Sequence, residues 1–280
     1  MTKETREILG VLKGVAASDG DGVKLRRYIG GPELDYLDPF LMLDVFGTDE
    51  PQDYIGGFPS HPHRGFETVT YLLAGKMRHK DNAGNEGVII PGGVQWMTAG
   101  RGIIHSEMPE QTEGLLKGFQ LWVNLPAKHK MTEPGYQEFP PENIPVYDLP
   151  DQNGSVRLIA GTLDSGEAGP VTNPHTNPNF MDITLNSGGV FTQSLEEDDH
   201  GFVFCIEGDI TVSGQTVHPG DLAVLGYGEL LQIKGEGEGG RCLFVSGTRL
   251  HEQVVKGGPF VMSTREDVLQ AFQDYQNGQF

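Results

Sequence analysis

Short apolar runs, interrupted by Gly or Pro every ten or so positions, dominate this sequence. Residues 68–100 (TVTYLLAGKMRHKDNAGNEGVIIPGGVQWMTAG) read as a strand, a Gly turn, a second strand, a polar loop, a Pro-Gly corner and a further strand. Residues 201–226 (GFVFCIEGDITVSGQTVHPGDLAVLG) repeat that order. Short strands punctuated in this way are typical of antiparallel sandwiches and barrels. The pattern predicts an all-β protein with two tandem β-barrels.

The boundaries of the two barrels follow from a Pro-rich stretch, EFPPENIPVYDLPDQNG. We expect an N-terminal barrel over 1–137, a linker over 138–154 and a C-terminal barrel over 155–280. A short helix is expected near the end, where Ser263 and Glu266 have the spacing of a capping box. The apolar positions that follow at helical spacing are Val268, Leu269, Phe272 and Tyr275.

Composition narrows the classes of partner. The formal net charge of −19 disfavours contact with nucleic-acid phosphates and anionic lipids, and we interpret the short basic stretch KLRR at 24–27 as a solvated strand end. Cys205 and Cys242 lie in apolar runs, which is typical of reduced core thiols. The first residues lack the apolar core of a signal peptide, and no run approaches the ~18 residues of a membrane span. We therefore expect a cytoplasmic protein that contacts neither membrane nor nucleic acid.

Two pairs of polar residues point to a metal. His61 and His63 in HPHRGFETVTYL are two apart, so on a strand they share a face about 6.6 Å apart. His105 and Glu107 in TAGRGIIHSEMPE have the same spacing. Three imidazoles and one carboxylate, without thiolate, suit a borderline first-row transition metal that keeps open coordination positions.

Glu67 is the rival carboxylate. It shares strand parity with His63, but four extended residues separate the two by about 13 Å along the strand. A strong bend at Gly65 would be needed to bring it to the ion, so Glu107 is the favoured ligand.

The second repeat serves as an internal control. Aligning Gly75 with Gly208 and Pro91 with Pro219 places four other residues at the positions of the four candidate ligands. They are Ser194, Glu196, Ile233 and Gly235. Three of the four ligand types are absent there, so we expect the fold to form without the cluster and the second barrel to bind no metal.

Five motifs together resemble the pirin family of the cupin superfamily. They are DPFLMLDVF, GGFPSHPHRGFETVTYLL, GVQWMTAGRGIIHSEMPE, FQLWVNLP and GGPFVMSTREDV, in that order along the chain. The resemblance implies two cupin barrels of the jelly-roll type, stacked face to face, with one Fe(II) in the N-terminal barrel. The family's ligand positions fall on His61, His63, His105 and Glu107. Mn, Co, Ni or Cu are alternatives, because this set of ligands selects weakly among divalent ions.

The resemblance also implies an activity. Some pirins resemble quercetin 2,3-dioxygenases, which open the central ring of a flavonol with O₂ and release carbon monoxide. O₂ and a small planar polyphenol are then the substrates, Glu107 is a candidate base, and Phe58, Met77 and Gln120 are candidates for lining the substrate pocket. Two alternatives stay open: a non-enzymatic, iron- or redox-sensing regulator that acts through a protein partner, and a metal-dependent isomerase of a small sugar or acid.

Overall fold

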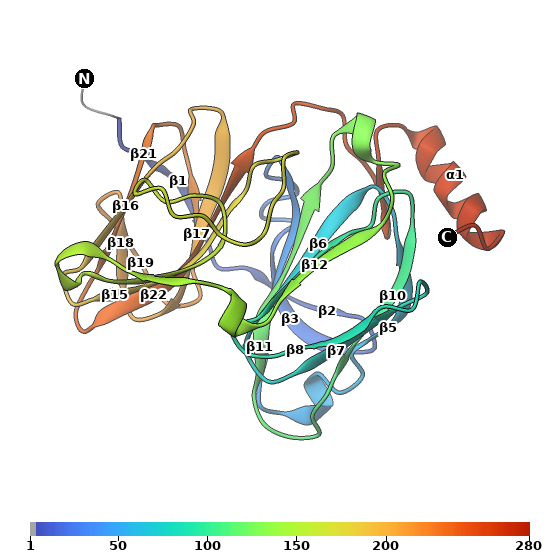
Figure 1. Ribbon diagram of the computed structural model, residues 1–280, viewed down its shortest axis with the longest axis horizontal. Coiled ribbons are helices and arrows are strands. Elements are labelled where there is room, and N and C mark those ends of the chain that lie inside the picture. The colour runs from blue at the N-terminus through green and yellow to red at the C-terminus, as the bar shows by residue number, and fades with distance from the viewer. Residues whose placement is uncertain (1–3) are drawn as a thin grey trace. The chain divides into compact units, whose positions relative to one another are not determined.

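The computed structural model describes residues 4–280, which form mostly antiparallel strands (Figure 1). The chain divides into two compact units that interleave in sequence. The first barrel comprises Val15–Tyr36, Phe40–Pro141 and Leu250–Phe280. The second barrel comprises the described residues up to Gly14, then Leu37–Pro39 and Glu142–Arg249. The predicted all-β architecture with two tandem barrels is confirmed.

The first barrel has a large and a small antiparallel sheet. The large sheet runs in the order β12 (Gly135–Phe139), β9 (Val94–Thr98), β6 (Phe66–Ala74), β11 (Leu116–Asn124), β4 (Phe40–Thr48), β3 (Val23–Ile29) and β2 (Val15–Asp19). The small sheet runs in the order β5 (Phe58–His63), β10 (Ile103–Pro109), β7 (Met77–Asp81) and β8 (Glu86–Ile89). Alternate side chains are buried along β7 and β10 of the small sheet, whereas β6 of the large sheet is buried along most of its length.

The second barrel repeats this order strand for strand. Its large sheet consists of β1 (Ile8–Leu12), β20 (Leu222–Leu225), β17 (Asp199–Glu207), β22 (Gly239–Thr248), β15 (Asn179–Asn186), β14 (Gly154–Ala160) and β13 (Val146–Asp148). Its small sheet consists of β16 (Val190–Ser194), β21 (Leu230–Gly235), β18 (Ile210–Val212) and β19 (Gln215–Val217). An apolar cluster in its interior includes Cys205 and Cys242.

Both ends of the chain depart from the predicted linear division. β1 pairs with β20 in the second barrel, at the position that β12 holds beside β9 in the first. Residues 250–280 belong to the first barrel, and the segment predicted as a linker holds the end of β12, β13 and two short helices. A sequence pattern can show that an edge strand exists, but it does not identify the strand with which it pairs. Periodicity therefore could not predict that each end of the chain belongs to the other barrel.

The C-terminal segment adds a hairpin and the single α-helix of the described residues. The hairpin pairs β23 (Val255–Gly257) with β24 (Phe260–Met262), and α1 (Arg265–Gln276) packs on both strands. The predicted N-cap was wrong by one residue: Thr264 accepts from the Asp267 backbone N–H at 3.1 Å, because Thr264 is the residue with the extended backbone before the helix. Val268 and Ala271 are buried, whereas Leu269, Phe272 and Tyr275 keep 54%, 38% and 38% of their surface exposed.

Four one-turn 3₁₀-helices connect strands. They are η1 (Pro51–Asp53), η2 (Ala127–His129), η3 (Pro141–Asn143) and η4 (Pro150–Gln152). Within residues 4–280, no helix has the length and apolar character needed to cross a membrane.

Candidate metal centre

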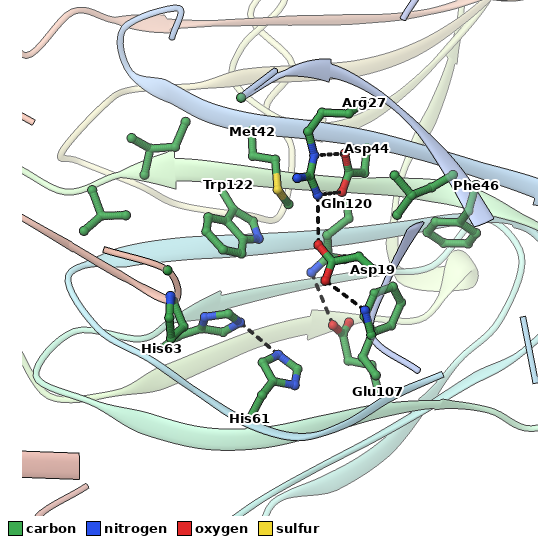
Figure 2. Close-up of a pocket in the computed structure, with 18 of the residues that line it drawn as sticks. Asp19, Arg27, Met42, Asp44, Phe46, His61, His63, Glu107, Gln120 and Trp122 are labelled. Atoms are coloured by element: carbon green, nitrogen blue, oxygen red, sulfur yellow. Dashed lines mark hydrogen bonds and ion pairs between the residues drawn. The ribbon is translucent and has the colours of Figure 1, made fainter. Parts of the chain in front are cut away.

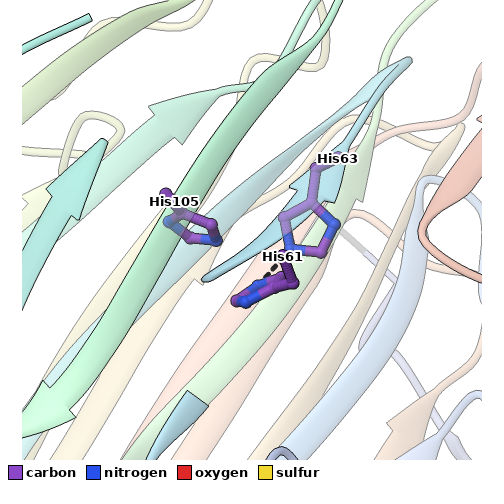
Figure 3. Close-up of side chains that lie close together, drawn as sticks. All are labelled: His61, His63 and His105. Carbon is purple, nitrogen blue, oxygen red and sulfur yellow. Dashed lines mark hydrogen bonds between the residues drawn. The ribbon is translucent and has the colours of Figure 1, made fainter. Parts of the chain in front are cut away.

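Two neighbouring strands of the small sheet bring three histidines together. His61 and His63 lie on β5 and share a face, as their spacing predicts. His105 on β10 is the direct cross-strand partner of His61. A left-handed turn at Gly65, whose φ is 89°, ends β5 and turns the chain into β6. Figure 3 shows the three rings converging on one point.

The geometry of the three rings is that of a ligand set. The Nε2 atoms of His61 and His63 are 3.0 Å apart, and the candidate ligand atoms of all three histidines lie within 4.8 Å of one another. In the part of the chain that the structure describes, no other three or more His, Cys, Asp or Glu side chains bring their ligand atoms close enough together to hold a metal ion. The cluster can therefore hold a metal ion.

Burial sets the protonation of the histidines. His63 and His105 are 3% and 1% exposed, and desolvation, reinforced by the neighbouring imidazoles, lowers the pKa of both rings well below the usual value. Both remain neutral, which is the form that binds metals. The Nδ1–H of His61 donates to the Pro59 carbonyl at 2.7 Å, which leaves its Nε2 lone pair free to coordinate.

His105 supplies a direct test of fit. Both of its ring nitrogens are buried and have no hydrogen-bond partner. Buried nitrogens without partners are uncommon, because each loses its hydration without compensation. A metal ion among the three rings would satisfy one of them, so the residues present fit a first-row transition metal.

Glu107 faces the same interior but is held differently. A bulge between His105 and Glu107 places Glu107 opposite Phe58. Its Oε1 accepts from the Thr70 hydroxyl at 2.7 Å and its Oε2 accepts from the Gln120 amide at 3.2 Å. It does not belong to the close group of three histidines. Its role as fourth ligand remains a prediction.

Glu67, the rival carboxylate, is engaged elsewhere. It is three residues from Thr70 on β6 and so points to the opposite face of the sheet from Thr70. Its oxygens accept from the Trp96 indole N–H at 3.0 Å and the Thr98 hydroxyl at 2.7 Å. The contacts agree with the preference for Glu107.

A cavity of about 620 Å³ within the first barrel opens onto His61 and His63. His61, His63, Glu107, Phe58 and Gln120 all line it (Figure 2). Two of the three candidate pocket residues, Phe58 and Gln120, therefore do lie in the cavity wall.

Met77, the third candidate, does not line this cavity and belongs to the hydrophobic core. It pairs with Pro109 and Ile89, whereas His105 pairs with Asp81 at the other end of the same strand. Four residues of extended strand, about 13 Å, separate the two ends. Met77 was wrongly placed because alternation gives the face of a strand but not the distance along it.

Arg27 was predicted to lie in a solvated strand end, but its side chain is only 25% exposed. Its guanidinium pairs with Asp44 through two hydrogen bonds of 2.8 and 2.7 Å, and both residues line the cavity together with Trp122. A buried Asp in the apolar run DPFLMLDVF was the available signal, since a buried carboxylate requires a partner.

Among its described residues, the second barrel has no counterpart of the cluster. The strand pairings show which residues are equivalent. Glu107 pairs with His79 on β7, and Ile233 pairs with Val212 on the equivalent strand β18. His105 pairs with His61, and Leu231 pairs with Gln193 in the same way. The residues at the four ligand positions are thus Gln193, Leu195, Leu231 and Ile233, which lie one or two positions from those predicted. Differences in loop length between the two repeats shifted the alignment by these one or two positions. None of the four residues at the equivalent positions is a His or a Glu.

Comparisons with known proteins agree with this architecture. The pirin family profile matches residues 22–123, and the profile of the pirin C-terminal cupin domain matches residues 180–280. A pirin-like protein of Caulobacter vibrioides is 49% identical over 98% of this chain and 99% of its own length. A Pseudomonas aeruginosa protein, provisionally named quercetin 2,3-dioxygenase, is also 49% identical, over 98% of this chain and 97% of its own.

The fold has a solved counterpart. The crystal structure of a quercetin 2,3-dioxygenase from Acinetobacter baumannii superposes with a TM-score of 0.89 at 33% identity, covering 99% of this chain and 98% of its own. Two cupin barrels with a histidine cluster in the first, matched along nearly their full length by relatives of this kind, show that the chain belongs to the pirin family.

Proposed function

We propose that this protein is a metal-dependent dioxygenase of the pirin type that opens flavonols such as quercetin with O₂. The observation that carries the proposal is that a cluster of three histidines, of which His61 and His63 line the cavity with Glu107, borders a cavity that also has aromatic side chains in its wall. The names of the relatives from Pseudomonas aeruginosa and Acinetobacter baumannii support the same activity.

The metal is proposed to be one Fe(II) per chain, held by His61, His63 and His105 with Glu107 as the fourth ligand. An Fe(II) ion bound there supplies Lewis acidity toward the substrate's oxygens and a place for O₂ to react. Mn, Co, Ni or Cu are alternatives, because imidazole and carboxylate discriminate weakly among these ions.

Glu107 is the group suited to take the proton from the flavonol hydroxyl. Of the three carboxylates in the cavity lining, those of Asp19 and Asp44 pair with the Arg27 cation. Glu107 accepts only from neutral donors, Thr70 and Gln120, so its charge is not offset by a cation. Glu107 is thus the carboxylate of the lining that no protein cation holds, and it can take the proton when it is released from the metal.

The remaining lining binds and orients a planar molecule. Phe46 and Phe58 line the cavity with Met42 and Trp122, and Figure 2 shows Phe46 on the opposite side from Met42 and Trp122. Flat apolar surfaces on two sides hold an aromatic ring and exclude water from the reacting bond. A volume of about 620 Å³ is within the usual range for a small-molecule site.

The test compares the iron-loaded protein with two variants. We expect about one metal equivalent per chain, O₂ uptake, carbon monoxide release and bleaching of the flavonol's long-wavelength absorption. His105→Ala should lose both metal and turnover. Glu196→Ala, an exposed change in the second barrel, should lose neither. A fully iron-loaded sample that leaves several flavonols unchanged in air would refute the dioxygenase and favour the non-enzymatic regulator.

A further inference from the structure

The end of the cavity away from the histidines is polar and fixed in place. Arg27 and Asp44 lie there, well separated from His61 and His63 in Figure 2. Arg27 on β3 and Asp44 on β4 are cross-strand partners, and their two-point ion pair is nearly buried on the Asp44 side, whose side chain is 3% exposed. The pair holds the guanidinium rigidly because both hydrogen bonds must break together.

Arg27 has donors to spare. Its Nε donates to Asp44, and its Nη2 donates to Asp44 and, at 2.9 Å, to Asp19. Its Nη1 donates to no group within the described residues, although the guanidinium lines the cavity. The other cation in the lining, Lys256, already donates to the carbonyl and the side chain of Asp35. Arg27 is therefore the cation that remains available to a ligand.

Asp19 places an acceptor beside these donors. Its side chain is 52% exposed and lines the same cavity. One oxygen accepts from the Gly20 backbone N–H at 2.8 Å and the other from Arg27, so each retains a lone pair. A fixed donor and a fixed acceptor side by side match a group that both accepts and donates a hydrogen bond.

We propose that Arg27 and Asp19 form a hydroxyl-recognition subsite, which selects uncharged polyphenols with free hydroxyls on the ring remote from the metal. The inference rests on the proposed function and specifies its substrate class. A carboxylate at this position would accept from Arg27 but would be repelled by Asp19 and Asp44. A methoxy group would accept but could not donate, and an unsubstituted ring would leave the spare donor of Arg27 and the spare lone pairs of Asp19 without a ligand partner.

The test measures binding apart from turnover, by anaerobic calorimetry on the iron-loaded protein. Four flavonols differ only on the remote ring, which carries two hydroxyls, none, two methoxy groups or a carboxylate. We expect the dihydroxy compound to bind about tenfold more tightly than the unsubstituted one, the value of one hydrogen bond to a charged group. The methoxy and carboxylate compounds should bind no better than the unsubstituted one.

Two variants assign the preference to the subsite. Asp19→Ala removes an exposed side chain and should reduce the tenfold ratio to about one without affecting folding. Arg27→Lys keeps the charge but loses the two-point geometry and should have the same effect. The matched control is Arg241→Lys in the second barrel, where Arg241 pairs with Asp182 at 2.9 and 2.6 Å; it should leave the ratio near ten.

The outcomes separate this inference from the proposed function. A ratio unchanged in Asp19→Ala, or a carboxylate compound that binds more tightly than the dihydroxy one, would overturn the subsite even if flavonols are oxidised. A tenfold preference that depends on Asp19, in a protein that oxidises no flavonol, would support the subsite and refute only the dioxygenase.

Discussion

A buried lysine ties the metal-site turn to the rest of the first barrel. The Lys130 ammonium is 2% exposed and donates to the carbonyls of Gly65 and Val261 at 2.8 and 3.0 Å and to the side chain of Asn124 at 2.6 Å. All three N–H groups are thus used. Gly65 is two residues after His63, so Lys130→Met should affect both stability and metal binding.

The size of the effect follows from two opposing contributions. Three buried acceptors left without donors cost about 2 kcal/mol each, or about 6 kcal/mol together. Desolvation lowers the pKa of Lys130 from 10.5 to about 8, so removing the ammonium recovers about 3 kcal/mol at about 1.4 kcal/mol per pKa unit. We expect Lys130→Met to lower the free energy of unfolding by about 3 kcal/mol at pH 7.

The pH dependence has a definite sign. Between pH 8 and 10.5 the unfolded chain binds more protons at Lys130 than the folded one, so the stability contributed by this group rises with pH. The methionine variant lacks this dependence. The difference in unfolding free energy between wild type and variant should therefore grow by about 1 kcal/mol from pH 7 to pH 9.

Urea unfolding at the two pH values and metal titration at pH 7 provide the measurements. Metal affinity should fall by about 10–100-fold, as expected when a group that orients a ligand is lost. The control is Lys234→Met, which removes a half-exposed lysine paired with Glu236 at 3.0 Å and should change stability by less than about 1 kcal/mol. A Lys130→Met protein as stable as wild type, or a difference that does not vary with pH, would refute the reasoning.

Four further substitutions test the metal site and the scaffold. His105→Ala should abolish metal binding with the fold intact by circular dichroism, whereas Leu231→Ala at the equivalent position should leave metal content unchanged and lower the unfolding free energy by about 2–5 kcal/mol. Glu67→Gln should keep its metal, measured by elemental analysis; loss of iron would reverse the assignment of Glu107. Thr264→Ala should lower stability by about 1 kcal/mol in thermal unfolding through loss of the helix cap, and an unchanged melting temperature would contradict that role.

The sequence alone could predict the histidine cluster because the geometry of the cluster depends on residues that are close in sequence. A spacing of two on a strand fixes that two side chains share a face, so His61 and His63 needed no knowledge of distant contacts. Placing His105 across from His61 required only that two strands be neighbours. The repeat likewise showed the barrels, since each strand and corner occurs in both copies in the same order.

Long-range partners were beyond that reasoning. The pairing of Arg27 with Asp44, the hydrogen bonds of Glu107 with Thr70 and Gln120, and the exchange of the terminal segments all join residues remote in sequence. Periodicity places each such residue on a face and leaves its neighbour along the sheet undetermined. Met77 is an example: the face of the strand on which it lies was predicted correctly, but its distance from the site was not, and it belongs to the hydrophobic core.

The two barrels also explain why the site is separable from the fold. At the positions of His63, His105 and Glu107 the second barrel carries Leu195, Leu231 and Ile233, all within its apolar core. Those residues stabilise the barrel by burying apolar surface, whereas the first barrel keeps polar groups and a cavity in the same place. Polar groups around a cavity forgo that packing, so other fixed contacts contribute to the stability of the first barrel. The Lys130 ammonium and the Arg27–Asp44 pair are two such contacts, and both hold strands that border the cavity.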